Sequence, residues 1–122
     1  MDYYITVNEK AISVNSMYGR NGSKSFLSKE AIFLQEEIRE ALEEKYGAFK
    51  QIEGKVTVKL HIERKKRRWD LDNMFKCIID GLVKAGVLVD DDQVFCIYAM
   101  KGEGFRDCIR VKVEEMPFQE II

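Results

Sequence analysis

Hydrophobic and polar positions follow two different periods along the chain, and the changes of period divide it into elements. Residues 3–7, YYITV, are aromatic and β-branched, which is typical of a β-strand. Residues 55–63, KVTVKLHIE, alternate apolar and polar positions, and residues 108–114, CIRVKVE, do the same, so both predict half-exposed strands. Residues 94–101, VFCIYAMK, are apolar on both faces, which favours a strand in the interior of a sheet.

Two longer segments repeat their apolar positions every three or four residues and therefore predict helices. The first helix is expected from about Ser28, a good N-cap residue, to Tyr46, with Gly47 just past its end. The second is expected to begin near Asp72 and to end at Gly86. Its apolar stripe comprises Leu71, Met74, Phe75, Ile78, Ile79, Leu82 and Val83.

Residues 14–26, VNSMYGRNGSKSF, separate the first strand from the first helix and predict a loop, because Gly, Asn and Ser dominate them. The order of elements is then strand, helix, strand, helix, strand, strand. We therefore expect an α+β fold, with a mixed sheet of about four strands and two main helices in one domain over residues 1–122.

Composition limits the function classes. Hydrophobic residues make up 46% of the 122, which argues for a globular fold and against disorder. The net charge is −1 and the pI about 5.9, so any nucleic-acid binding must rest on local charge. Cys77, Cys96 and Cys108 form no CxxC pair, which favours reduced thiols over disulfides or zinc. Without a signal peptide or a membrane-length apolar run, we expect a soluble, cytoplasmic protein.

The densest positive charge lies at residues 64–68, RKKRR, directly after a predicted strand. Most charge runs of this kind are solvated loops. A compact patch of cations can also hold a DNA phosphate backbone by releasing its counterions. The run alone leaves both interpretations open.

Two carboxylates follow that run at once, in the tetrapeptide DLDN of residues 70–73. One Asp here would be a helix cap at the positive end of the dipole. Two acids two positions apart point to different sides of a helix, but in extended backbone they share a side, about 7 Å apart. If the second helix begins near Asp72, Asp70 and Asp72 can therefore converge on one cation.

Lys76 follows Asp72 by one helical turn and opens a ladder that continues with Asp80 and Lys84. Pairs at this spacing stabilise a helix by only a few tenths of a kcal/mol each, about 0.2–0.5. For Asp80 and Lys84 we favour a solvated salt-bridge face. Lys76 lies beside the two carboxylates, where an ammonium can stabilise the charge on a phosphate.

A further acidic group, Asp90, Asp91 and Asp92, precedes the strand at residues 94–101. One Asp would be turn chemistry, but three adjacent carboxylates repel one another, which a simple turn does not require. Clustered carboxylates suit hard cations such as Mg²⁺ or Mn²⁺. The one histidine, His61, lies on the polar face of a strand and is interpreted as structural or solvent-facing.

Residues 70–94, DLDNMFKCIIDGLVKAGVLVDDDQV, resemble the RusA family of Holliday-junction resolvases. The family pattern has DLDN, a lysine four residues after its second Asp, D-x-L, a helix end in AG, and DD-x-Q-V, all of which occur here. Asn15 and Tyr18 are a weaker match to the family's N-N-x-Y region, without the prolines that often precede it. Trp69 stands where the family often has a basic residue.

The resemblance implies a RusA-like fold and a magnesium-dependent endonuclease, with Mn²⁺ as a substitute, that resolves four-way DNA junctions by paired symmetric cuts as a homodimer. It implies metal-binding and catalytic roles for Asp70, Asp72 and Asp91, with Lys76 assisting. The residues expected to contact DNA are Arg64, Lys65, Lys66, Arg67, Arg68, Arg20, Lys24, Asn15 and Tyr18.

Several alternatives stay open. A related nuclease for flaps or other branched DNA would carry the same acids, and a DNA- or protein-binding module would use them only as caps. The sequence also leaves open the number of metal ions and whether Asp90 or Asp92 adds to the metal site.

The length of the second helix bears on how the acids meet. Fourteen helical residues span about 21 Å. If the flanking strands are parallel, Asp72 and Asp91 lie at opposite edges of one subunit. Either the loop at residues 87–90 folds far back, or the site is composite, with Asp70 and Asp72 of one chain meeting the Asp91 of a second copy. We expect the composite arrangement, which gives a two-fold dimer two equivalent sites.

Overall fold

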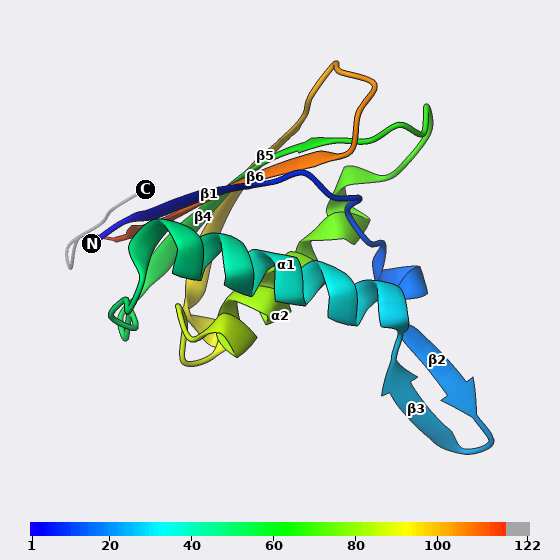
Figure 1. Ribbon diagram of the computed structural model, residues 1–122, viewed down its shortest axis with the longest axis horizontal. Coiled ribbons are helices and arrows are strands. Elements are labelled where there is room, and N and C mark those ends of the chain that lie inside the picture. Colours follow the sequence, from blue (N-terminus) through cyan, green and yellow to red (C-terminus); the bar gives the residue numbers. More distant parts are fainter. Residues whose placement is uncertain (117–122) are drawn as a thin grey trace.

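A four-stranded mixed sheet organises the computed structural model, which describes residues 1–116 (Figure 1). The strands are β1 (Tyr3–Val7), β4 (Val56–Glu63), β5 (Val94–Lys101) and β6 (Cys108–Glu115), in the spatial order β1-β6-β4-β5. β4 and β5 are parallel, whereas β6 is antiparallel to both β1 and β4. The predicted α+β class and the parallel crossover between the two helix-flanking strands are confirmed.

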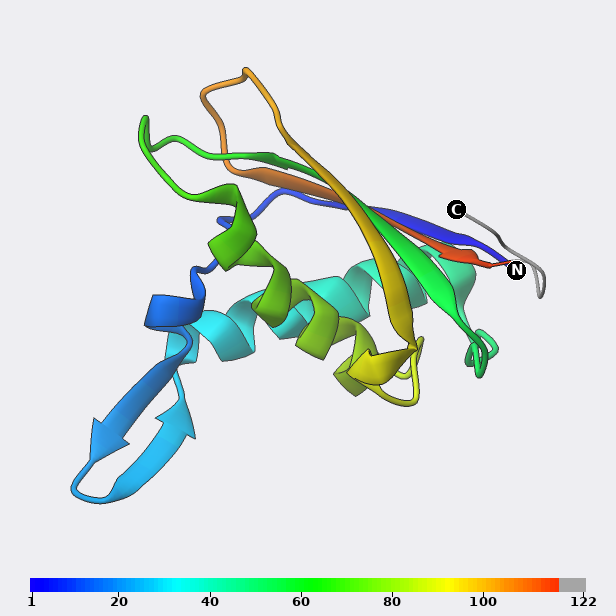
Figure 2. The same cartoon turned by 180° about the vertical axis from the view of Figure 1, so that it is seen from behind.

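Two helices, α1 (Lys29–Tyr46) and α2 (Phe75–Ala85), lie against the same face of that sheet (Figures 1 and 2). The Ser28 hydroxyl caps α1 by accepting a hydrogen bond from the Ala31 amide. Gly47 and Gly86 end the two helices at φ 65° and 89°, conformations that favour glycine. Both helices end where their glycines predict, and α1 also begins as expected, whereas α2 begins at Phe75 and not near Asp72.

The core fills the space between the helices and the covered sheet face. Its larger fully buried side chains include Tyr3, Met17, Leu34, Ile38, Leu42, Ile62, Met74, Ile78, Leu82, Leu88 and Ile109. Burial of one such aliphatic side chain contributes about 1.5–3 kcal/mol to stability. The core thus fixes α2 against the sheet, and with it the side chains that α2 presents elsewhere.

The loop prediction for residues 14–26 is wrong. The segment forms a 3₁₀ turn, η1 (Val14–Ser16), followed by the antiparallel hairpin β2 (Tyr18–Asn21) and β3 (Lys24–Leu27). Asn21 pairs with Lys24, so Gly22 and Ser23 form the two-residue turn, and Gly22 has φ 66°. A Gly-Ser pair between two strands is a known hairpin signal, and it was present in the sequence.

The prediction of an interior position for residues 94–101 is also wrong, because β5 lies at the edge of the sheet. Tyr98 and Met100 are each about 60% exposed, on the sheet face away from the helices, where Tyr4 of β1 is exposed too. Apolar residues on both faces of a strand predict that both faces are covered. Within one copy of this chain, the helices cover only one face of β5.

Two further features concern residues 1–116. No helix in this range is long and apolar enough to cross a membrane. The three cysteines are free thiols, as expected, and Cys77 and Cys108 are buried.

Candidate active site

The two DLDN acids lie just before α2 and have different backbone conformations. The chain enters the helix through a 3₁₀ turn, η2 (Leu71–Met74), with Asp70 in extended backbone before it and Asp72 inside it. Asp72 therefore does not share the extended conformation that would bring both carboxylates to one side. Within residues 1–116 neither side chain takes a hydrogen bond or ion pair, and the Asp70 side chain does not cap the turn.

A cavity of about 380 Å³ lies between α2 and β5, on the helix side of the sheet. Its polar lining comes from Asp72 at the start of α2, Lys76 and Asp80 along the helix, and Asp91 after it. The apolar lining comprises Val14, Phe75, Ile79, Val94 and Ile97. Asp70 is not among the lining residues.

The premise of the composite-site expectation is therefore wrong. Asp72 and Asp91 do flank α2, but both border the same cavity within one chain. The reason is a second 3₁₀ turn, η3 (Asp91–Gln93), which carries Asp91 to the side of the helix. Asp91 lies near enough to Lys76 and Asp80 for all three charges to interact. A second copy is not needed to bring the two acidic turns to one cavity.

Lys76 and Asp80 form the central contact of this cavity. The Lys76 Nζ lies 3.3 Å from an Asp80 carboxylate oxygen, one helical turn away. The hydrogen bond that Lys76 donates to Asp80, together with the charge of that carboxylate, raises the pKa of Lys76, so the ammonium stays protonated. The Asp80 side chain is only 25% exposed, so it is more than part of the solvated face that the sequence favoured. The i, i+4 spacing to Lys76 was the signal that could have identified it.

The three acids before β5 have different roles. Asp90 caps η3 by accepting a hydrogen bond from the Asp92 amide, and Gln93 completes the capping box. Asp91 alone of the three reaches the cavity beside α2. The carboxyls of Asp90 and Asp91 interact directly, which raises the pKa of Asp91 and lowers that of Asp90. Asp92 is exposed and borders neither of the two acid-lined cavities.

Gln93 is the residue that holds this turn in place, and the sequence analysis did not single it out. Its amide oxygen accepts hydrogen bonds from the Val89 and Asp90 amides. Its amide nitrogen donates to the carbonyls of Ile52 and Gly54, 2.8 and 2.9 Å away. A buried glutamine with four backbone partners fixes the acidic turn relative to the sheet.

A neighbouring cavity of about 310 Å³ shares Asp80 and Asp91 with the first. Its other lining residues include Tyr18 at the base of the hairpin, Asp90, Lys84 and the buried Gln35. Tyr18, predicted to contact DNA, thus lies beside the acidic residues although it is remote from them in sequence. Asn15 is exposed in η1 and borders neither cavity.

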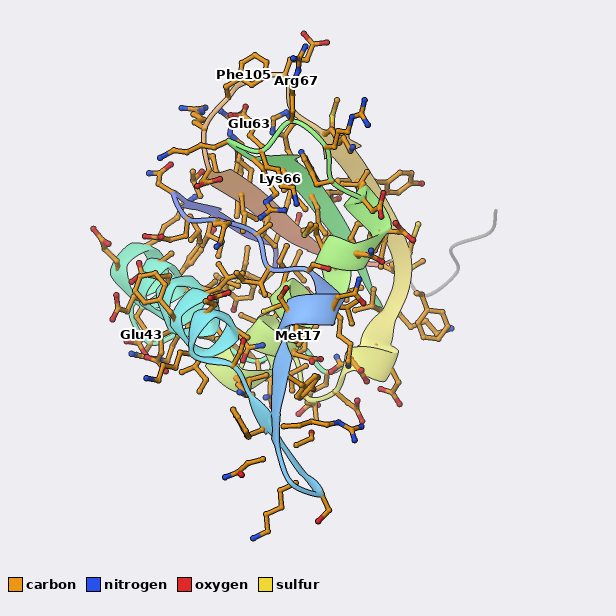
Figure 3. All side chains as sticks on the ribbon, turned by 90° about the vertical axis from the view of Figure 1, so that its right-hand side faces the viewer. Met17, Glu43, Glu63, Lys66, Arg67 and Phe105 are labelled. Atoms are coloured by element: carbon orange, nitrogen blue, oxygen red, sulfur yellow. The ribbon has the colours of Figure 1, made fainter. Side chains whose placement is uncertain are left out.

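The basic segment, residues 64–68, projects from the end of β4 (Figure 3). Lys65 through Arg68 are exposed, whereas Arg64 is half-buried. Below the segment, the carboxylate of buried Glu63 accepts a hydrogen bond of 2.6 Å from Arg106, which lowers the pKa of Glu63. This pairing anchors the β5–β6 connection beside the basic segment.

A further cation stands next to Asp70. Lys101, at the end of β5, donates a hydrogen bond to the Trp69 carbonyl, and its Nζ lies 4.6 Å from the centroid of the Trp69 ring. Trp69 packs against the core. Positive charge therefore sits immediately before the first acid although residue 69 is not basic, and only the fold brings Lys101 there.

Carboxylate oxygens are the donors that Mg²⁺ and Mn²⁺ prefer, so the chemistry of Asp72, Asp80 and Asp91 fits such an ion. Their positions fit less closely. Among the described residues, no three His, Cys, Asp or Glu side chains come together as a ready-made set of metal ligands. Carboxylate oxygens suitable for such an ion therefore line one cavity, but they are not close enough together to form a complete set of metal ligands.

Comparison with known proteins identifies the family of the chain. The family model of endodeoxyribonuclease RusA matches residues 10–114, from before the hairpin into β6. The chain belongs to the RusA family of endodeoxyribonucleases. It is 28% identical over 91 residues to the crossover junction endodeoxyribonuclease RusA of Enterobacteria phage HK97, and the match covers 74% of this chain and 75% of that protein. The RusA resemblance of residues 70–94 is thereby confirmed and extended over most of the fold.

Proposed function

We propose that this RusA-family nuclease resolves four-way DNA junctions by magnesium-dependent hydrolysis of two symmetric phosphodiester bonds. The observation that carries the proposal is the cavity between α2 and β5. There the fold brings together carboxylates from both acidic turns and a protonated lysine, in a chain of this nuclease family. The curated relative from phage HK97 bears the name of a crossover junction nuclease, which supports the substrate class.

In this proposal Asp72 and Asp91 hold the metal, Asp70 joins them, and Mn²⁺ can replace Mg²⁺. The bound ion would acidify a water molecule and polarise the scissile phosphate. Lys76 keeps its proton because of Asp80, so its ammonium is available to a phosphate oxygen. The cations of residues 64–68 and Lys101 hold the DNA backbone next to the acids, which positions the DNA without reading its sequence.

The uncovered face of the sheet supports a homodimer. Tyr4, Tyr98 and Met100 border a shallow cavity of about 430 Å³ on this face. Four strands at a spacing of about 4.8 Å, each about 16–26 Å long, give several hundred Å² per copy, and two copies approach the roughly 1,000 Å² of a stable interface.

Charged side chains surround this shallow cavity. Glu114 forms ion pairs with Lys59 and Lys112, which border the cavity together with Arg110. The α2 cavity lies on the opposite side of the sheet, so each active site would belong to one chain.

Cleavage of labelled substrates tests the nuclease proposal. Wild type and Asp72→Asn are compared on a four-way junction, a flap and a linear duplex, with and without Mg²⁺. We expect symmetric nicks in the junction that need Mg²⁺ and disappear in the variant. Cutting of flaps alone would move the proposal to another branched substrate, and binding without cutting of any substrate would leave a DNA-binding module.

Cys96 offers a native probe for the dimer. It pairs with Thr57 and so has the same strand parity as Tyr98, on the uncovered face. We expect a short bismaleimide to link two chains through Cys96, because Cys77 and Cys108 are buried. We expect Tyr98→Glu combined with Met100→Glu to give monomers by light scattering. A dimer that survives this pair of substitutions would place the interface elsewhere.

A further inference from the structure

The hairpin β2–β3 stands away from the body of the protein, beyond the N-terminal end of α1 (Figures 1 and 2). It belongs to the longest acid-free part of the chain, since residues 10–29 contain no Asp or Glu in a protein with 21 of them. The hairpin itself carries two cations, Arg20 and Lys24. In a chain of net charge −1, this projection is locally basic.

The base of the hairpin is held firmly. Met17 is fully buried, and its carbonyl accepts a hydrogen bond of 2.6 Å from the Ser28 amide. The Ser28 hydroxyl donates to the Ser16 carbonyl at 2.8 Å. Across the strands, the Phe26 ring covers Gly19 so closely that a Cβ there would lie 2.6 Å from the ring. These contacts make the projection a paired ribbon of fixed direction.

The two cations point to opposite faces of this ribbon. Arg20 is paired with Ser25, and Lys24 with Asn21, and neighbouring positions along a strand alternate between faces. A flat partner could contact only one of the two side chains. A groove with phosphates on both walls could contact both at once.

The ribbon also starts at the acidic cavities. Tyr18, its first residue, lines the cavity that contains Asp80 and Asp91. The basic segment at residues 64–68 and the start of α2 lie on the same side of the molecule as the hairpin in both ribbon views (Figures 1 and 2). Figure 3 shows that side of the molecule. The basic segment, with Lys66 and Arg67, lies above the hairpin base, which is marked by Met17.

We propose that the β2–β3 ribbon enters a groove of a double-helical DNA arm next to the scissile phosphate, with Arg20 and Lys24 on the phosphates of opposite strands. A two-stranded ribbon fits the major groove, which is about 12 Å wide. Four residues per strand reach about 13 Å from the cavity, which exceeds the groove depth of about 8.5 Å. This inference rests on the proposed nuclease function and adds the surface that orients its substrate.

The test measures binding of a labelled duplex and of a four-way junction over a series of salt concentrations. All variants carry Asp72→Asn, so that no DNA is cut. The hairpin variant combines Arg20→Ala with Lys24→Ala. The control variant combines Lys50→Ala with Lys55→Ala, and it removes two exposed cations that lie after the far end of α1 and just before β4. Light scattering and a thermal melt accompany each variant.

Each phosphate contact contributes about 0.9 to the slope of log K against log salt, so the hairpin variant should lower the slope by about 1.8. Between 50 and 200 mM salt, wild-type affinity should then fall about 12-fold further than that of the hairpin variant. The control pair should leave the slope unchanged. A photo-crosslinker on Ser23→Cys, at the hairpin turn, should label the DNA in a chain that also carries Cys96→Ser, which removes the accessible native thiol.

An unchanged slope in the hairpin variant, with the fold intact, would overturn the proposal. A change in oligomeric state with an unchanged slope would also overturn it and would make the hairpin an arm between protein copies. The nuclease proposal fails separately, in the cleavage assay with the hairpin intact. Reduced slope in a protein that cuts no DNA would support the ribbon and reject the nuclease.

Discussion

The two acidic turns at the ends of α2 have similar composition and different structural roles. In η2, Asp70 and Asp72 take no hydrogen bond or ion pair within residues 1–116. In η3, Asp90 caps the turn, and the buried Gln93 ties it to the sheet through four hydrogen bonds. Carboxylates that form no hydrogen bonds with the surrounding turn are the clearer candidates for catalysis. In η3, the capping role of Asp90 must be distinguished from a role in catalysis for each acid in turn.

Loss of Asp72 should produce the largest effect and separate function from stability. We expect Asp72→Asn to lower the cleavage rate by more than about 100-fold, because even second-shell changes at metal sites cost about 10–100-fold. Its unfolding midpoint in urea should stay that of the wild type. Asp91→Asn should behave in the same way.

Asp92→Asn is the matched control for these variants, since Asp92 is exposed and outside both cavities. It should keep near wild-type cleavage and Mg²⁺ dependence. A loss as large as that of Asp91→Asn would mean that the η3 acids act as one cluster, and the distinction between Asp91 and Asp92 would be wrong.

Asp80→Asn should have the next largest effect, through Lys76. Without the Asp80 carboxylate, the pKa of Lys76 falls, so the alkaline limb of the pH–rate profile should move to lower pH. We expect the maximal rate to fall by about 10-fold or more. Lys84→Ala, which removes the next charge of the ladder, serves as control. An alkaline limb that stays in place would show that Asp80 does not act through Lys76.

Substitution of Asp90 should affect mainly the stability of the fold, in contrast to substitution of Asp72 or Asp91, which should affect mainly the cleavage rate. Asp90→Ala removes the η3 cap and should lower the free energy of unfolding by about 0.5–2 kcal/mol in urea titration. Asp90→Ser should recover most of this loss, because a serine hydroxyl can replace the capping oxygen. Equal stability of the alanine and serine variants would contradict the capping role.

The smallest effect expected is a shift of the acid limb of activity in the same Asp90→Ser variant. The neighbouring Asp90 carboxyl raises the pKa of Asp91, so Asp91 holds its proton to a higher pH than an ordinary Asp. A cation needs the ionised form, and cleavage should therefore decline as pH falls through this raised pKa. Without Asp90, the decline should occur at lower pH. A shift in the opposite direction would reject the coupling of the two carboxyls.

Local signals sufficed for most of the fold. The Ser28 cap, the glycines after both helices and the alternation in residues 55–63 each depend on neighbours in sequence, and each is confirmed. The prediction of an interior position for β5 was wrong. A strand that is apolar on both faces has the same sequence pattern whether its second face is covered by its own chain or by another surface. The hairpin was missed because its strands are short and mostly polar, so the Gly22-Ser23 turn looked like part of a loop.

The candidate site depended more on tertiary structure. The motif singled out Asp72, Lys76 and Asp91, which all border one cavity in the structure, and their catalytic roles stay predictions. The meeting of both acidic turns at one cavity depends on how η3 folds back, which helix length alone does not encode. The capping box of Asp90 and Gln93 is a local pattern, but the bonds of Gln93 to Ile52 and of Lys101 to Trp69 cross about 30 to 40 residues of sequence, so no local pattern shows them.

The place of β6 in the sheet has a consequence for biosynthesis. β6 is the last described element in the chain, yet it lies between β1, the first, and β4. A nascent chain on the ribosome therefore cannot join its first strand to the rest of the sheet until residues 108–115 have left the exit tunnel. Until then β1 and one edge of β4 lack the strand that joins them, and unpaired strand edges of this kind favour aggregation.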